Sequence, residues 1–212
     1  MDQLDTTADQ IRAEFELTNT ARDQAYQRSR ELISLCARAI RAIHREEWAR
    51  AEALIAEAQK ATQVMVEGVR DYPNLYHAGY TQDAVKEFVE ANLTYALVRD
   101  LPLPTPADLN TEGSTWLNGL AEAATELRRR ILDIIRHGHS DEAERLLDVM
   151  DQIYSQLVTF DFNDSITGGL RRRTDTVRAV LERTRGDVTN SLRQAQLEEA
   201  LKNVESRLSG YG

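Results

Sequence analysis

Apolar residues recur every three to four positions through almost the whole chain, and few residues interrupt that spacing. Only 10 glycines and 4 prolines occur among the 212 residues, and three of the prolines lie together in residues 102–106. A period of three to four residues is typical of amphipathic helices. An all-β fold would need many more turn residues than these. We therefore predict an all-α protein.

Breaks in the periodicity divide the chain into seven expected helices within a single domain, 1–212. Their ranges are residues 6–43, 46–69, 81–98, 115–136, 140–158, about 163–183 and 188–207. The proline loop at 102–106 ends the third helix, and residues 75–80 are expected to be irregular. Ser140 is expected to cap the fifth helix, and one of residues 163–165 the sixth. Residues 209–212 are expected to fray.

The composition is that of a globular helical protein, with 42% hydrophobic and 29% charged residues. A single cysteine, Cys36, excludes an internal disulfide and a cysteine zinc site, and its apolar surroundings predict a buried side chain. No apolar stretch approaches the roughly 20 residues that span a bilayer. The acidic start of the chain does not resemble a signal peptide. We expect a cytoplasmic protein with no membrane partner.

The formal net charge of −9 argues against a simple nucleic-acid coat protein, which would need a basic surface. The positive charge is nevertheless unusual in kind. Lys60, Lys86 and Lys202 are the only lysines, and every other cationic side chain apart from histidine is an arginine. The planar guanidinium suits paired contacts to phosphate or carboxylate better than an ammonium does.

Two pairs of glutamates are the strongest candidates for a chemical site. Glu87 and Glu90 lie three residues apart in the third expected helix, and Glu122 and Glu126 lie four apart in the fourth. Either spacing places both carboxylates on one helical face. If the two faces meet, the carboxylates repel one another unless a cation neutralises them, and oxygen-only ligands suit Mg²⁺ or Mn²⁺. Such an ion can activate water and stabilise a phosphoryl transition state.

The same pairs are open to a purely structural interpretation. A chain with 35 acidic residues contains many such pairs by chance, and most form solvated helix faces. Glu90, Glu122 and Glu126 lie among Ala, Val and Leu rather than among other charges, which favours a site. No Walker loop, dinucleotide-binding glycine motif, His-Glu-x-x-His motif or nucleophile elbow is present.

Arginines follow the second glutamate pair and recur early in the sixth expected helix. The candidates for contact with nucleic-acid phosphates are Arg128, Arg129, Arg171, Arg172, Arg173 and Arg178. Arginine stripes in an acidic protein can bind phosphates in a local groove. Pairing with the many acidic side chains of the same chain is the alternative, and the sequence leaves both open.

Several segments together resemble the translin superfamily, specifically its translin-associated factor X (TRAX) branch. Residues 87–90, Glu-Phe-Val-Glu, resemble the family's Glu-aromatic-Val-Glu motif. Residues 119–127, Gly-Leu-Ala-Glu-Ala-Ala-Thr-Glu-Leu, resemble its Gly-Val-Ala-Asp-x-x-x-Glu-Leu segment. Residues 35–45, 169–175 and 185–189 resemble archaeal members. The likeness runs in order over nearly the whole chain.

The resemblance implies a seven-helix bundle that assembles into a hollow homo-octamer and binds single-stranded RNA or DNA on its inner surface. The TRAX branch is an Mg²⁺-dependent endoribonuclease. Carried over by motif, Glu87, Glu90, Glu122 and Glu126 would be the catalytic and metal-holding carboxylates. Glu122 departs from the family motif, which has aspartate there, so its carboxylate lies one methylene further from the backbone.

The sequence supports three functional hypotheses. The leading one is a metal-dependent endoribonuclease that acts on single-stranded RNA. The second is a translin-like protein that binds single strands without cleaving them, with the strong salt dependence of such binding. The third is a helical adaptor that binds no nucleic acid.

Overall fold

The computed structural model describes residues 1–209, and all regular structure in that range is helical. The eight helices are α1 (Asp2–His44), α2 (Trp48–Gly68), α3 (Pro73–Tyr76), α4 (Gly79–Val98), α5 (Gly113–Ile135), α6 (Asp141–Leu157), α7 (Asp164–Thr167) and α8 (Leu170–Ser209). The all-α prediction is confirmed. None of these helices combines the length and apolarity that crossing a membrane requires.

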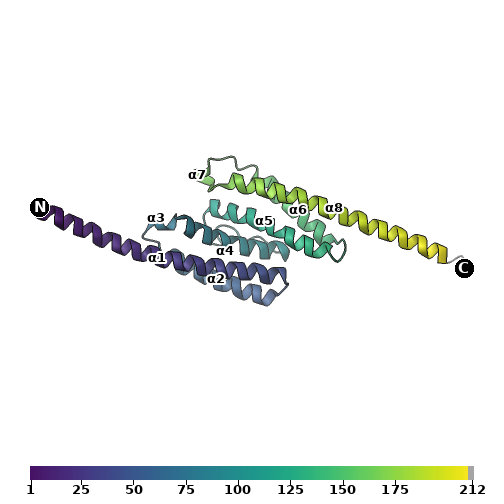
Figure 1. Cartoon of the computed structure of the whole chain (residues 1–212), viewed down its shortest axis with the longest axis horizontal. Coiled ribbons are helices and arrows are strands. Elements are labelled where there is room, and N and C mark those ends of the chain that lie inside the picture. The colour runs from purple at the N-terminus through teal and green to yellow at the C-terminus, as the bar shows by residue number, and fades with distance from the viewer. Residues whose placement is uncertain (210–212) are drawn as a thin grey trace.

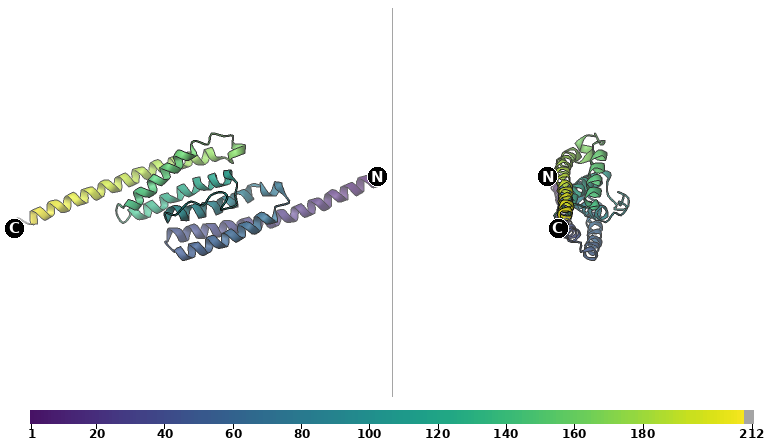
Figure 2. Two further views of the ribbon diagram at one scale, coloured as in Figure 1. Left: turned by 180° about the vertical axis from the view of Figure 1, so that it is seen from behind. Right: turned by 90° about the vertical axis from the view of Figure 1, so that its right-hand side faces the viewer.

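Four long helices lie side by side in the order α1, α4, α5, α8, and α2 and α6 back this layer (Figure 1). Helix α2 packs against α1 and α4, and α6 packs against α5 and α8. The view from behind in Figure 2 shows α2 and α6 on the near side. Within residues 1–209, no helix packs over the opposite face of α4 and α5.

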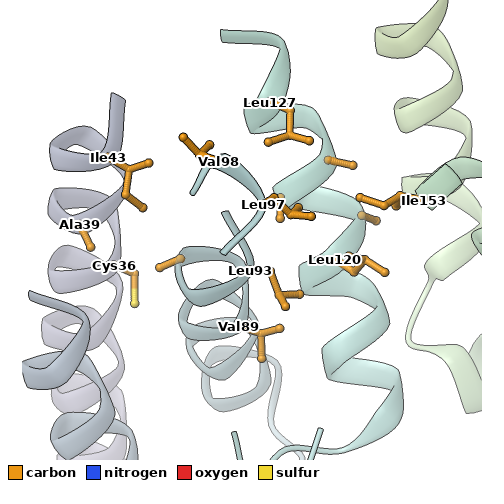
Figure 3. Close-up of a cluster of buried hydrophobic side chains, with 14 of the residues drawn as sticks. Cys36, Ala39, Ile43, Val89, Leu93, Leu97, Val98, Leu120, Leu127 and Ile153 are labelled. Atoms are coloured by element: carbon orange, nitrogen blue, oxygen red, sulfur yellow. The ribbon is translucent and has the colours of Figure 1, made fainter. Parts of the chain in front are cut away.

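One continuous apolar core joins the two layers. Figure 3 shows Cys36 and Ile43 on the side of α1 toward α4, with Ile43 level with Val98, and Leu93 of α4 directed toward Leu120 of α5. Cys36 is fully buried in this core, as predicted. Burial of side chains at every third or fourth position is the pattern that the apolar spacing indicated.

The two longest helices extend well beyond the core. Helix α1 has 43 residues, but Ala25 is its first buried residue. Helix α8 has 40 residues, and Val188 is its last buried one. The free halves project from opposite ends of the molecule (Figure 1). Both expose apolar side chains, which are Leu4, Ile11, Phe15 and Leu17 on α1 and Leu197, Leu201, Val204 and Leu208 on α8.

The predicted break between the last two helices is wrong, because α8 runs without interruption through residues 183–188. A glycine inside a helix costs only about 1 kcal/mol relative to alanine. Buried Thr184 and Val188 flank Gly186, and Asp187 pairs with Arg128 of α5 at 2.8 Å. These contacts outweigh the cost of the glycine.

The break lies earlier, at two glycines. Gly168 and Gly169 have φ values of 62° and 80°, and they separate the single turn α7 from α8. Glycine adopts this left-handed region without the steric cost of a Cβ atom. Asn163 caps α7 by accepting from Ser165 N at 2.9 Å, and Ser140 caps α6 as expected. Residues 75–80, expected to be irregular, contain the end of α3 and the first residues of α4. Of the end expected to fray, Ser209 is the last residue of α8, and residues 210–212 lie outside the described range.

Candidate metal centre

Helix α4 carries a group of ionisable side chains on the face that is not covered by α2. Lys86, Glu87 and Glu90 lie within about one turn of one another, so their side chains project in similar directions. Glu90 is 7% exposed, and Lys86 is almost as buried. A buried charge needs a partner or must be neutralised. This face of α4 therefore has to be matched by groups on neighbouring helices.

Gly119 brings α5 close to this part of α4. A Cβ atom at residue 119 would lie 2.6 Å from Cγ1 of Val89 and 3.1 Å from the carbonyl oxygen of Lys86. No side chain larger than hydrogen fits there without displacing α4. Glu122 lies three residues after Gly119, so the close approach of the helices carries its carboxylate toward Glu87 and Glu90.

Three of the four predicted carboxylates converge. One ligand atom each from Glu87, Glu90 and Glu122 lie within 4.8 Å of one another. This three-glutamate cluster joins α4 to α5, and Cys36 of α1 lies beside it. Burial, and then the charges of Glu87 and Glu90, raise the pKa of the Cys36 thiol to about 12. The thiol is therefore protonated and offers no thiolate ligand.

Burial and the proximity of like charges alter the pKa values of the cluster. Burial, followed by the charges of Glu87, Glu122 and Glu126, raises the pKa of Glu90 to about 9. Burial also raises the pKa of Glu87, although the charge of Lys86 opposes the shift. Without a further cation, Glu90 therefore carries a proton at neutral pH.

Two cations of the chain hold Glu122. Lys86 Nζ lies 2.8 Å from its Oε1 atom and 2.7 Å from its Oε2 atom, and 3.4 Å from Oε1 of Glu87. Arg173 of α8 donates from Nε to Oε1 of Glu122 at 2.9 Å and from a terminal nitrogen to Oδ1 of Asn118 at 3.1 Å. Burial works against the charged form of Lys86, but its hydrogen bond to Glu122 and the nearby carboxylate charges raise its pKa.

Glu126 lies outside the three-glutamate cluster and has a different partner. Its Oε2 atom is 2.6 Å from Nε2 of His44, the last residue of α1. The charge of Glu126 still contributes to the raised pKa of Glu90. The second predicted pair is therefore divided, because Glu122 joins the cluster and Glu126 binds a buried imidazole beside it.

The donor set of the cluster suits a hard divalent cation. Three carboxylate oxygens within a few ångströms are the ligands that Mg²⁺ and Mn²⁺ favour, and no thiolate competes with them. Burial, followed by the neighbouring carboxylate charges, raises the pKa of Glu90, and one more nearby positive charge would oppose that shift. The residues of this site therefore fit such an ion.

The six candidate arginines do not form one surface. Arg173 touches Glu122, and Arg128 pairs with Asp187 at 2.8 Å and donates to Thr184 at 3.0 Å. The other four, Arg129, Arg171, Arg172 and Arg178, are exposed. Arg129 lies seven residues after Glu122 and shares its helical face. Arg171 and Arg178 share a face of α8 that points away from Arg173.

Sequence reasoning missed His44, Lys86 and Asn118 as parts of this site. Lys86 carried a signal, because it is one of only three lysines and directly precedes Glu87. His44 carried none that spacing could reveal, since 82 residues separate it from Glu126. Asn118 accepts a hydrogen bond from Arg173 and donates one to Thr167 O at 2.7 Å, and no sequence pattern indicated either contact.

Comparisons with known proteins agree with this architecture. No family model matches the chain. The uncharacterized protein MJ0175 of Methanocaldococcus jannaschii is 30% identical over 196 residues, which cover 90% of this chain and 85% of the relative. AfC3PO, solved as a complex with duplex RNA, is 30% identical with a TM-score of 0.82, over 89% of this chain and 97% of that chain.

Two further structures show the same fold. The crystal structure of AfC3PO again gives a TM-score of 0.82 and 30% identity, and the match covers 98% of that chain. The crystal structure of apo-NeC3PO matches with a TM-score of 0.79 over 87% of this chain and 96% of that chain. Because its sequence is only 19% identical, this match supports the fold alone.

The helix order and the shared layer of long helices define a translin-type helical protein. The chain belongs to the translin superfamily, in which it is an archaeal C3PO-like protein. The family resemblance of its motifs is thereby confirmed.

Proposed function

We propose that this chain is a metal-dependent endoribonuclease whose active site is the three-glutamate cluster. The observation that carries the proposal is the convergence of Glu87, Glu90 and Glu122, whose ligand atoms lie within 4.8 Å of one another. The cluster coincides with the two motifs that resemble the TRAX branch. Mg²⁺ is the proposed cofactor, with Mn²⁺ as a substitute.

Each side chain of the site has a distinct part in this proposal. Glu87, Glu90 and Glu122 would hold the ion, and Glu126 would lie beside it, held by His44 at 2.6 Å. When bound, a divalent ion neutralises charge on the scissile phosphate and lowers the pKa of an attacking water. Arg173, which Glu122 and Asn118 hold through hydrogen bonds, would contact a phosphate next to the cluster.

The proposed substrate is single-stranded RNA. The similar protein AfC3PO was solved as a complex with duplex RNA, so both forms of RNA belong in the assay. Arg129 shares a face of α5 with Glu122 and Glu126, which supports a role in holding the strand near the cluster. Arg171, Arg172 and Arg178 would contact phosphates further along α8.

A binding protein without turnover is the second candidate, and one contact favours it. Lys86 already neutralises both oxygens of Glu122. If the ammonium stays there permanently, no divalent ion gains all three carboxylates, and the chain binds RNA without cleaving it. The two candidates differ in a single observable, which is product formation that depends on metal.

We further propose that the chain forms a hollow homo-octamer with the cluster facing inward. The free halves of α1 and α8 expose rows of apolar side chains that find no partner within residues 1–209. Burial of such rows against other copies would remove them from water. Native mass spectrometry should then give the mass of eight 24.0 kDa chains.

The decisive test is cleavage of a labelled, unstructured RNA and of a duplex RNA, each with and without Mg²⁺. We expect metal-dependent products from the parent protein. Glu90→Gln and Glu126→Gln should each slow cleavage by about 100-fold or more, because groups that stabilise a transition state electrostatically contribute on that scale. Glu57→Gln, an exposed change on α2, is the matched control.

Binding measured in parallel separates the two candidate functions. If Glu90→Gln binds RNA as tightly as the parent but no longer cleaves it, Glu90 acts in the cleavage step and not in RNA binding. Tight binding by the parent protein with no metal-dependent product would establish the binding protein instead. If Glu90→Gln and Glu126→Gln cleave as fast as the parent, the assignment of the site is wrong.

A further inference from the structure

Lys86 lies where a cation bound to Glu122 would have to lie. Its Nζ atom contacts both carboxylate oxygens of Glu122, at 2.8 Å and 2.7 Å, and reaches Oε1 of Glu87 at 3.4 Å. The side chain is 10% exposed. The ammonium therefore bridges two of the three carboxylates in the cluster.

Arg173 holds the same carboxylate but in a less obstructive way. Its Nε atom contacts only Oε1 of Glu122, at 2.9 Å, and the guanidinium is also fixed by Asn118. A carboxylate has about four lone-pair positions, so Arg173 and an ion can share Glu122. An ammonium in contact with both oxygens of Glu122 occupies the position between them that a chelating cation would take.

A polar cavity beside the cluster offers a second position for the Lys86 side chain. The cavity has a volume of about 490 Å³ and lies beside the cluster, between the start of α4 and the start of α5. Asp83 lines it together with Lys86 and Arg173. Asp83 lies three residues before Lys86 on α4, the spacing at which an acid and a lysine can pair.

We propose that Lys86 is an internal competitor of the divalent cation. The Lys86 side chain must leave Glu122 and swing into the polar cavity toward Asp83 before the three carboxylates can bind the ion. This inference rests on the proposed metal-dependent function. Two cations cannot occupy one position among the carboxylates, because they repel each other strongly at such short separation. The ammonium keeps the ion-free cluster neutralised, and it lowers the affinity for the metal in return.

Chemical labelling of lysines tests the movement without measuring catalysis. The chain has only three lysines, and Lys60 and Lys202 are exposed on α2 and α8. Reductive methylation followed by peptide mass spectrometry should show slow modification of Lys86 in EDTA and at least about fivefold faster modification in Mg²⁺, once its two carboxylate contacts are lost. Lys60 and Lys202 should be modified equally in both conditions. Unchanged protection of Lys86 in protein that has bound Mg²⁺ would overturn the proposal.

Calorimetric titration of Mg²⁺ into the full chain provides a second readout. Lys86→Met should bind Mg²⁺ about tenfold more tightly than the parent. Substitution of groups that contact metal ligands changes metal affinity by about 10- to 100-fold, and about tenfold is the lower end of that range. It should also unfold more easily in EDTA, because Glu122 loses a partner. Lys86→Arg keeps the charge and should leave the affinity near that of the parent. Lys60→Met, which removes the same charge far from the cluster, should change neither property.

The outcomes separate this inference from the proposed function. Tighter binding by Lys86→Met supports the competition. Equal or weaker binding by a folded Lys86→Met overturns it, and the proposed nuclease stands if the parent still binds Mg²⁺ and cleaves RNA. If neither the parent nor Lys86→Met binds Mg²⁺, both proposals fail together. If Lys86→Met does not fold, the labelling of the parent protein decides.

Discussion

Nε2 of His44 lies 2.6 Å from Oε2 of Glu126, and this contact joins the last residue of α1 to the middle of α5. The imidazole is 1% exposed. Its other nitrogen, Nδ1, has no hydrogen-bond partner among residues 1–209. Within that range Glu126 is therefore the only polar partner of the buried ring, and the ring in turn fixes the direction of the Glu126 carboxylate next to the cluster.

We predict that His44→Ala lowers the free energy of unfolding by about 2–3 kcal/mol, because it removes a buried hydrogen-bond partner and leaves a small cavity. Urea unfolding followed by circular dichroism measures the change. His137→Ala is the matched control, since His137 is exposed in the turn after α5 and should unfold like the parent. Equal urea midpoints for both variants would contradict a structural role for the His44–Glu126 contact.

The buried Glu90 carboxyl makes stability depend on pH. Its ordinary pKa of 4.5 is raised to about 9 in the folded chain. Below pH 4.5, Glu90 is protonated in both the folded and the unfolded state. Between these two values the unfolded chain releases the proton and the folded chain keeps it, so stability falls as pH rises, by up to about 1.4 kcal/mol per pH unit. Above about pH 9 this loss levels off.

Glu90→Gln removes that titration. In EDTA, the difference in unfolding free energy between Glu90→Gln and the parent should therefore grow in favour of the variant from pH 5 to pH 9. Urea midpoints at several pH values measure the difference. Glu57→Gln, on the exposed side of α2, should follow the parent at every pH. A constant difference between Glu90→Gln and the parent would mean that Glu90 is ionised in the folded protein.

The helices and the site differed in how far the sequence could predict them. Periodicity located α2, α5 and α6 to within about two residues, because each carries its own apolar stripe. It failed at Gly186, where burial of Thr184 and Val188 on either side outweighs a local propensity. Helix spacing did predict that Glu87 and Glu90 share a face, because residues three apart in one helix lie on the same side of it.

The meeting of the two glutamate pairs is a tertiary relation, and no periodicity contains it. Only the family resemblance predicted that Glu122 would approach Glu87 and Glu90. The partners of these carboxylates could not be predicted from the sequence for the same reason. Lys86 and Arg173 lie 36 and 51 residues from Glu122 along the chain. Pairing between distant residues depends on how helices pack, which a single sequence does not reveal.

Binding of Mg²⁺ should release a proton at pH 7.5. Glu90, with its pKa near 9, is protonated there in the ion-free protein and must ionise to become a ligand. We expect about one proton per bound ion, and an affinity that rises up to about tenfold per pH unit toward pH 9. Calorimetry in Hepes and in Tris, which differ in ionisation enthalpy, measures the release. Glu90→Gln should release none, and a heat that is independent of buffer in the parent would exclude Glu90 as a ligand.

Gly119 should be the position where one added methyl group most disturbs the site. The new Cβ atom would lie 2.6 Å from Cγ1 of Val89 and force α5 away from α4. We expect Gly119→Ala to lose about 1–3 kcal/mol of unfolding free energy through overpacking. It should also bind Mg²⁺ more weakly, because Glu122 moves with α5.

Gly186→Ala is the matched control for this change. A Cβ atom there meets nothing within 4 Å, and Gly186 lies inside the continuous helix α8. The same substitution should therefore stabilise the protein by up to about 1 kcal/mol and leave Mg²⁺ binding unchanged. Urea midpoints and calorimetric affinities of the two variants decide the question. If Gly119→Ala were as stable as Gly186→Ala and bound Mg²⁺ equally well, the close approach of α4 and α5 would not be what assembles the three carboxylates.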